Sequence, residues 1–337
     1  MSHEPKLSVH IVTYNHARFI GQALDSVLMQ RSLCDYEIVI GDDCSNDGTA
    51  EIIKDYQRRW PDRIKPFFRD KNLGPGRNAV DILGRCRGEY IAFLEGDDYW
   101  TDPDKLRLQL DYLDNHADCA LVHHAVDQIS WPSGESLGEH PAPRFRIERP
   151  SERILAMGNF IQTCSVMFRK SMLPSLDDKF LALKIGDWPL FVLLSQNGWI
   201  GYIDRPMAHY RIHESNSWNN RAAEFKLRAM ESMAWYLCEH VNESSRHYWK
   251  DTILALAFKD MVLALKSLRW SSCFAKLRYF VQTSAKLHRP FWLLNCLWPY
   301  WRANHASNST RCRKPQRTAS CGQQTRPDAF REGLRSC

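Results

Sequence analysis

Strand-like and helix-like segments alternate four times along the first part of the chain, and this alternation limits the fold more than any other feature. The four strand-like runs are residues 7–12, 36–43, 63–68 and 90–94. After each of the first three runs, apolar residues recur at the three- and four-residue spacing of a helix. This pattern is typical of a mostly parallel, Rossmann-like sheet with helices on its faces. The sequence therefore predicts an α/β fold.

Polar residues follow three of these runs, at the edge where parallel sheets bind ligands. The densest group is the stretch EGDD at residues 95–98, where three carboxylates fall within four residues. Carboxylates this close repel one another, so the cluster predicts a bound cation. Oxygen ligands suit Mg²⁺ or Mn²⁺, which takes few protein ligands and shares its shell with substrate phosphates. A solvated turn is the alternative that three acids after a strand leave open.

The second part of the chain first continues the mixture of strands and helices. A helix is predicted near residues 103–113, strands at 119–126, 164–173 and 201–213, and a further helix at 187–198. Residues 131–150 contain four prolines and little periodicity, so they are interpreted as a loop, and as a candidate lid. From about residue 219 only helices are predicted, at 221–243, 246–268 and 271–287.

The net charge of +6 is concentrated at the C-terminal end. Residues 302–337 carry eight Lys/Arg and two Asp/Glu, a net +6, so residues 1–301 sum to about zero. This distribution gives no support for a nucleic-acid partner of the folded part. The 11 cysteines include no C-x-x-C pair, and no signal peptide precedes Leu7, so a reduced cytoplasmic location is expected.

Two segments at the C-terminal end, residues 290–301 and 302–337, differ from the rest of the chain in composition. Residues 290–301, PFWLLNCLWPYW, are dense in aromatic residues and leucine beside basic residues. They form either a packed helix or a peripheral contact with the inner face of a membrane. No apolar run reaches the ~18–20 residues of a membrane span. Residues 302–337 lack isoleucine, valine, methionine, tryptophan and tyrosine, so this basic tail is expected to be disordered.

Six short motifs stand in an order that resembles the family 2 glycosyltransferases. VTYN (12–15), DDCSNDGT (42–49), NLGPGRN (72–78) and EGDD (95–98) are similar to the nucleotide-sugar half of that family. GDW (186–188) and YRIHESNSW (210–218) are similar to its acceptor half. The resemblance implies a GT-A fold and an inverting transfer reaction in cell-surface glycan synthesis. It divides the chain into a GT-A domain (1–218, with halves 1–100 and 101–218), a helical extension (219–301) and the tail.

The resemblance also implies which residues bind the donor, a UDP-sugar. Thr13, Tyr14 and Asn15 would line the nucleoside pocket, although Asn15 could also cap the helix that follows. Asp43 would accept a hydrogen bond from the uracil N–H, while Asp42 is expected to be more structural. Arg77 would pair with the diphosphate through its planar fork of donors.

For the metal and the sugar, the resemblance implies the acids at residues 95–98. Asp97 would be the principal metal ligand, and Asp98 would contact ribose, sugar or metal-bound water. Glu95 departs from the family pattern, which has aspartate there, but its longer side chain could reach the ribose or the metal. His213 would contact the diphosphate or the metal, with a structural role as the alternative. His123 and His124 are interpreted as strand residues.

Asp187 matches the general base of the family, which removes a proton from the acceptor hydroxyl. Gly186 stands where the family has a first acid, and a helix-capping role for Asp187 is the structural alternative. Trp188 would wall the acceptor pocket or lie in the core.

Two other functions remain open from the sequence. They are a nucleotidyltransferase and an inactive scaffold that still binds a sugar nucleotide. The acceptor, a saccharide or lipid-linked glycan, is not identified.

Overall fold

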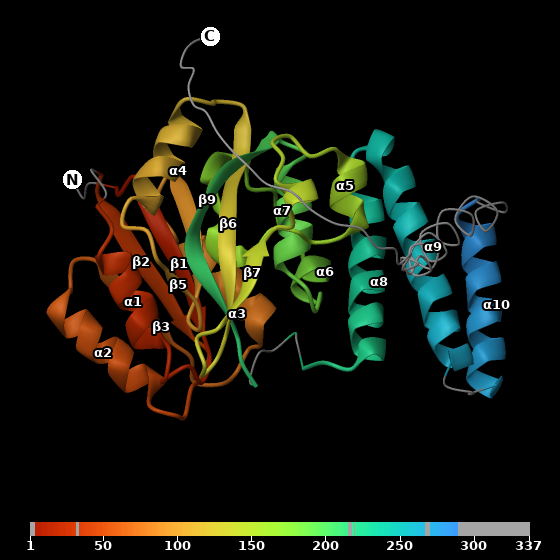
Figure 1. Cartoon of the computed structure of the whole chain (residues 1–337), viewed down its shortest axis with the longest axis horizontal. Helices are drawn as coiled ribbons and strands as arrows, with labels where there is room; N and C mark the ends of the chain where they lie inside the picture. Colours follow the sequence, from red (N-terminus) through yellow and green to blue (C-terminus); the bar gives the residue numbers. More distant parts are fainter. Residues whose placement is uncertain (1–3, 32–33, 215–217, 219, 267–269, 289–337) are drawn as a thin grey trace, which may run out of the picture. The chain divides into compact units, whose positions relative to one another are not determined.

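The structure, a computed structural model, describes residues 4–31, 34–214, 218, 220–266 and 270–288. The chain divides into two compact units, Met1–Arg289 and Pro290–Cys337, and the described residues all belong to the first. Within this unit the strands form one nine-stranded sheet in the order β3-β2-β1-β4-β8-β6-β9-β5, with β7 paired to β6 (Figure 1). The strands are β1 (Leu7–Thr13), β2 (Tyr36–Asp42), β3 (Ile64–Phe68), β4 (Tyr90–Glu95), β5 (Tyr99–Trp100), β6 (Cys119–Ser130), β7 (Ser136–His140), β8 (Met167–Arg169) and β9 (Trp199–Ile212).

Most of the helices lie where the sequence predicts them, whereas the short helices α5 and α6 were not predicted. They are α1 (Ile20–Leu28), α2 (Thr49–Arg59), α3 (Pro75–Arg85), α4 (Lys105–Asp114), α5 (Glu152–Met157), α6 (Asp178–Leu181), α7 (Asp187–Leu194), α8 (Ala223–His240), α9 (Glu243–Lys266) and α10 (Trp270–Lys286). The mixed architecture, with a central sheet and flanking helices, confirms the predicted α/β fold class.

Strands β1 to β4 pair in parallel, as the alternation of strands and helices predicts. Successive side chains of a strand face opposite sides of the sheet. On one side, Val9 of β1 belongs to a buried cluster with Leu24 of α1 and Leu106 of α4. On the other side, Ile82 of α3 packs on Gly41 of β2, where an added Cβ would lie 2.4 Å from the Ile82 Cγ1 atom. Helices therefore cover both faces, and the carboxyl ends of the parallel strands share one open edge.

The second part of the sheet is mixed, and here one prediction is wrong. Residues 131–150 are not only a loop, because Ser136–His140 forms β7, which pairs antiparallel with β6. The prediction missed this strand because its side chains are mostly exposed, so no apolar alternation marks it. Strand β8 pairs antiparallel with both β4 and β6, whereas β9 runs parallel to β6.

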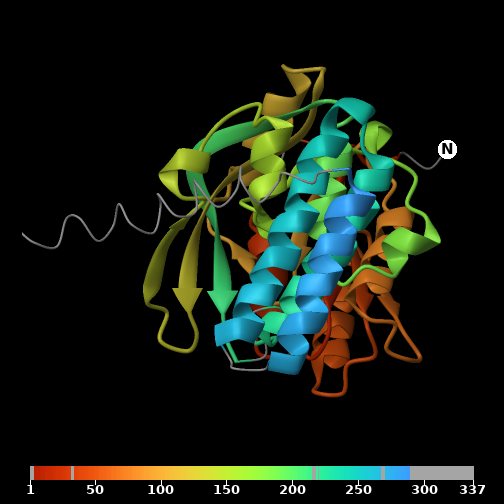
Figure 2. The same ribbon diagram turned by 90° about the vertical axis from the view of Figure 1, so that its right-hand side faces the viewer.

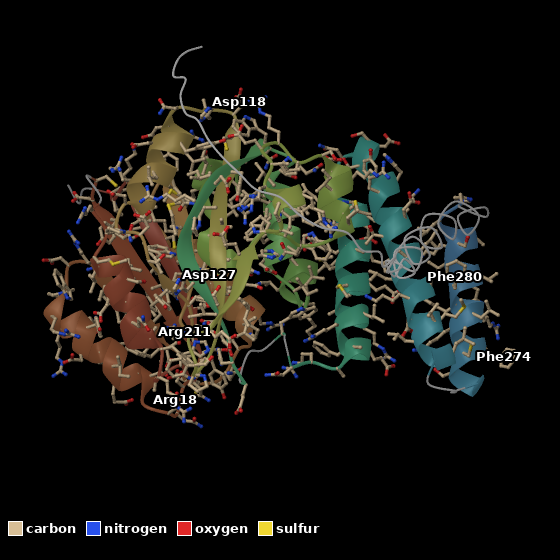
Figure 3. The ribbon with its side chains drawn as sticks, in the orientation of Figure 1. Arg18, Asp118, Asp127, Arg211, Phe274 and Phe280 are labelled. Atoms are coloured by element: carbon tan, nitrogen blue, oxygen red, sulfur yellow. The ribbon has the colours of Figure 1, made fainter. Side chains whose placement is uncertain are left out.

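The described residues of the helical extension contain α8, α9 and α10, which lie side by side with α9 in the middle (Figures 1 and 2). The three helices confirm the all-helical prediction for this part of the chain. Phe280 of α10 faces α9, with its ring 6.1 Å from that of Phe258. Phe274 points away from the other helices and is 70% exposed (Figure 3).

The predictions for residues 290–301 and for the tail, 302–337, concern residues outside those that the structure describes. The contact with a membrane and the disorder of the tail therefore stay predictions. Among the helices of the described residues, none is both long and apolar enough to cross a membrane.

Candidate active site

The register of the sheet places the polar strand ends beside one another. Thr13 is paired with Asp42 of β2, and Val12 with Glu95 of β4. The backbone N–H of Asp43 donates to the carbonyl oxygen of Thr13 at 3.0 Å. The polar ends of β1, β2 and β4 therefore meet at one edge, as the sequence predicts.

The turn after β1 holds the three residues predicted for the nucleoside pocket. Thr13 is buried, and its hydroxyl oxygen has no hydrogen-bond partner in the described part of the chain, whereas Tyr14 is 45% exposed. Asn15 has a φ of 56°, and its side-chain oxygen accepts the N–H of Asn46 at 2.9 Å. The predicted helix cap by Asn15 is wrong, because α1 begins only at Ile20. The Asn15 side chain instead ties this turn to the loop after β2.

Asp43 holds the NLGPGRN loop in place. One carboxylate oxygen accepts the N–H of Leu73 at 2.7 Å, and the other accepts the N–H of Gly74 at 2.9 Å. Gly74 has a φ of 85°, a conformation that favours glycine. Each carboxylate oxygen can accept a second hydrogen bond. The predicted contact of Asp43 with uracil is therefore compatible with this geometry and stays a prediction.

Arg77 lies in the first turn of α3, and its side chain is exposed. Its neighbour Gly76 faces the segment that leads to α7, because an added Cβ would lie 3.7 Å from the carbonyl oxygen of Leu183 and 4.0 Å from that of Leu181. The predicted diphosphate ligand thus directly follows a residue that faces the segment before α7.

The three carboxylates of the acid turn, residues 95–98, differ in the direction in which the protein shifts their pKa. Burial raises the pKa of Glu95 well above its usual value, and the charges of Asp98, Asp97 and Asp187 raise it further. Burial also raises the pKa of Asp98, with the charge of Asp97 as the next cause. Burial would raise the pKa of Asp97 too, but two neighbouring imidazoles outweigh it, and the pKa lies below its usual value. Asp97 is therefore the carboxylate of the turn that is most readily ionised.

The two imidazoles belong to His213 and His16. The Nε2 atom of His213 lies 3.0 Å from Oδ2 of Asp97, and Nε2 of His16 lies 3.8 Å from the same oxygen. The structure thus brings together Asp97 and His213, and the predicted contact of each with a metal or diphosphate stays a prediction. His16 was not predicted, because a single histidine after a strand gives no signal until the fold places it beside an acid.

Asp98 and Arg211 connect the acid turn to β9. Asp98 is 1% exposed, and its Oδ1 accepts the backbone N–H of Arg211 at 2.8 Å. The Arg211 guanidinium donates to the carbonyl oxygen of Asp97 and to the side chain of Gln22, and it lies 4.2 Å from the Tyr99 ring centroid. This buried cation offsets part of the negative charge of the turn. The motif YRIH contained the signal for it, a cation two residues before His213.

Asp187 faces the acid turn from the acceptor half. It is the first residue of α7, and Gly186 occupies the N-cap position, so the predicted capping alternative is wrong. Its Oδ2 accepts hydrogen bonds from the Asn159 side-chain amide at 3.0 Å and from the Thr163 hydroxyl at 3.5 Å. Burial raises the pKa of Asp187. Because its charge also raises the pKa of Glu95, the two carboxylates lie within electrostatic reach of each other.

Three other residues singled out in the sequence lie in the core. Trp188 is 8% exposed, and its indole N–H donates to the carbonyl oxygen of Leu155 at 2.9 Å. It therefore does not form an open wall of the acceptor pocket. His123 and His124 are buried in β6, as expected for strand residues.

The donor set at this site fits a divalent cation that completes its shell with substrate phosphate. Among the residues that the structure describes, no group of three or more His, Cys, Asp or Glu side chains forms a cage for a metal ion. Mg²⁺ and Mn²⁺ sites at phosphates need only one or two protein carboxylates. The partly exposed carboxylate of Asp97 supplies one, and the imidazole of His213 lies beside it.

We expect Glu95→Gln to raise the Tm of the metal-free protein at neutral pH. The substitution removes one of the repelling carboxylates from a buried turn and keeps the size of the side chain. A gain of about 1 kcal/mol would raise the Tm by roughly 2–4 °C for a domain of this size. Thermal unfolding measures the change, with Glu89→Gln as a control, because the Glu89 side chain is 60% exposed. An unchanged or lower Tm for Glu95→Gln would show that repulsion between Glu95 and the other acids of the turn does not destabilise the protein.

Proteins of other organisms match this chain by sequence, and two of them are relatives of different coverage. The chain is 38% identical over 214 residues to an uncharacterized protein of Mycobacterium tuberculosis, an alignment that covers 64% of this chain and 61% of that protein. The chain thus spans about three fifths of that relative's length. It is also 27% identical to an uncharacterized glycosyltransferase of a Nostoc species, with 88% of this chain and 90% of that protein covered.

Solved structures share the fold. TarS of S. aureus, residues 1–349 in complex with UDP-GlcNAc, matches with a TM-score of 0.63 and 20% identity, covering 90% of this chain and 89% of that one. A mannosyltransferase of Pyrobaculum calidifontis in complex with GDP-Man and Mn²⁺ matches with a TM-score of 0.53 and 14% identity, covering 87% and 86%. The model of the family Glycosyl transferase family 2 matches residues 8–173. The residues that the model matches thus form a glycosyl transferase family 2 domain.

Proposed function

We propose that the protein transfers a sugar from a nucleotide-diphosphate sugar to a hydroxyl group of a saccharide or lipid-linked glycan, with inversion at the anomeric carbon. The observation that carries the proposal is the meeting of two groups from different halves of the chain. The acid turn, with His213 beside Asp97, would form a site for a cation and a diphosphate, and Asp187 of α7 lies within electrostatic reach of Glu95 in that turn. TarS binds UDP-GlcNAc in a similar fold, which supports a nucleotide-sugar donor.

In this proposal the donor lies along the carboxyl edge of β1, β2 and β4. Thr13, Tyr14 and Asn15 would contact the nucleoside, and a UDP-sugar is favoured because Asp43 can accept the uracil N–H. Arg77, exposed at the start of α3, would pair with the diphosphate. Three further groups would contact the metal, the ribose or the sugar, namely Glu95, Asp98 and His213.

Asp187 would act as the general base. Its carboxylate takes the proton of the acceptor hydroxyl while the acceptor oxygen attacks the anomeric carbon. The bond from the anomeric carbon to the diphosphate oxygen breaks, and the nucleoside diphosphate leaves with the electron pair. A single displacement without an enzyme nucleophile inverts the configuration. A divalent cation held by Asp97, with His213 beside it, would supply charge neutralisation for the leaving diphosphate.

The reaction is tested by incubating the protein with Mn²⁺ and a panel of nucleotide sugars, with saccharide and lipid-linked acceptors. We expect a glycoside whose anomeric configuration, read by proton NMR, is inverted relative to an α-linked donor. A product with retained configuration would contradict the role of Asp187 as a base acting in one displacement. A cytoplasmic location and peripheral contact with a membrane, through residues 290–301 and the tail, stay predictions.

A further inference from the structure

Two side chains from the segment between α5 and β8 donate hydrogen bonds to the carboxylate of Asp187. Asn159 and Thr163 both donate to Oδ2, at 3.0 and 3.5 Å. Asn159 lies two residues after the end of α5, and Thr163 begins the short turn before β8. Because both donors engage the same oxygen, they orient the carboxylate. Asn159 makes the shorter of the two contacts.

The segment that carries Asn159 is in turn held by the helical extension. The hydroxyl of Thr252, on α9, donates to the carbonyl oxygen of Ala156 in the last turn of α5 at 2.9 Å. The Trp188 indole, on α7, donates to the carbonyl oxygen of Leu155, and its ring lies 6.2 Å from that of Trp249 on α9. Helix α5 is thus fixed between α7 and α9 by groups on both (Figure 1).

A further contact joins the start of the same helix to the extension. The side-chain amide of Gln196, just after α7, donates to Glu152 in the first turn of α5 at 2.8 Å. The side-chain oxygen of Gln196 accepts the backbone N–H of Asn242, in the turn between α8 and α9, at 3.0 Å. The end of α5 therefore contacts the helical extension directly, through Thr252. The start of α5 contacts the extension through the side chain of Gln196.

We propose that Asn159 is a positioning residue for the base Asp187, and that α9 serves the reaction by fixing the segment that carries Asn159. The inference rests on the proposed role of Asp187. It gives the helical extension a function that lies outside the matched family region, residues 8–173. The extension acts through α5 and does not touch the reacting atoms.

The test is the pH profile of kcat for Asn159→Ala. The amide hydrogen bond favours the ionised carboxylate, and its loss should raise the pKa of Asp187. Since the carboxylate is the active form, the acid limb of kcat moves to higher pH. Loss of orientation should also lower kcat by about tenfold or more. Glu95 is the charged group that faces Asp187, and it is unchanged in the variant.

Two companion variants complete the test. Thr252→Val, remote from the reacting groups, should shift the acid limb in the same direction by a smaller amount, with the KM for the donor unchanged. Asn197→Ala is the matched control, because its amide donates to the carbonyl oxygen of Met172, away from the base, and its acid limb should stay in place. An Asn159→Ala enzyme with an unshifted acid limb and normal kcat would overturn the inference. If Asp187→Asn itself kept full activity, the proposed function would fail first.

Discussion

Asp187→Asn should lower kcat for sugar transfer by about 10²–10⁴-fold, the usual contribution of a general base. Asparagine keeps the size of the side chain but cannot take the proton of the acceptor hydroxyl. Binding of the nucleotide should be unchanged, because Asp187 lies on α7 in the acceptor half and the predicted nucleotide contacts lie after β1, β2 and β4.

The role of Asp187 as the base also predicts how kcat/KM of the wild-type enzyme depends on pH. Only ionised Asp187 can act as a base, so kcat/KM falls as the pH falls through its pKa. Burial raises that pKa, so the acid limb should lie at a higher pH than for an exposed aspartate. Asp178→Asn is the matched control, since Asp178 also begins a helix but is exposed. A fully active Asp187→Asn enzyme would show that another group is the base, or that the reaction has a different course.

Much of the site could be predicted because its signals are local. The strand ends are marked by apolar runs that stop at polar residues, and parallel pairing brings those ends together. Asp97 follows such a strand, β4, so its place at this edge needed no knowledge of long-range contacts. The roles predicted for Asp187 and His213 came from the resemblance of GDW and YRIHESNSW to the motifs of the family.

The rest of the site depends on contacts between distant segments. His16 and Arg211 acquire their roles because the fold places both beside Asp97, and His16 has no distinctive local pattern. Asn159 contacts Asp187 across 28 residues of sequence. Asn15 has the side chain of a helix cap, but a contact with the loop after β2 uses that side chain instead. The roles of these four residues thus depend on tertiary contacts that the sequence pattern does not reveal.

The second large effect is expected for Asp97→Asn. Asp97 is the acid of the turn with a lowered pKa, and it is the proposed ligand of the cation beside His213. The amide should weaken metal binding and remove charge stabilisation from the departing diphosphate, lowering kcat by about 10²-fold or more. The control is Asp118→Asn, an exposed position at the opposite end of the sheet from Arg211 (Figure 3). Equal activity of the two variants would rule out Asp97 as the ligand.

The most direct measurement is thermal unfolding of the wild type and Asp97→Asn with UDP, GDP, TDP or CMP, each with and without Mn²⁺. A ligand present at ~100 times its Kd adds about 2.7 kcal/mol of stability. This corresponds to roughly 5–10 °C in Tm for a domain of this size. We predict a shift with UDP that requires Mn²⁺ and that is lost in Asp97→Asn. No shift with any nucleotide would contradict the account of the acid turn as a donor site.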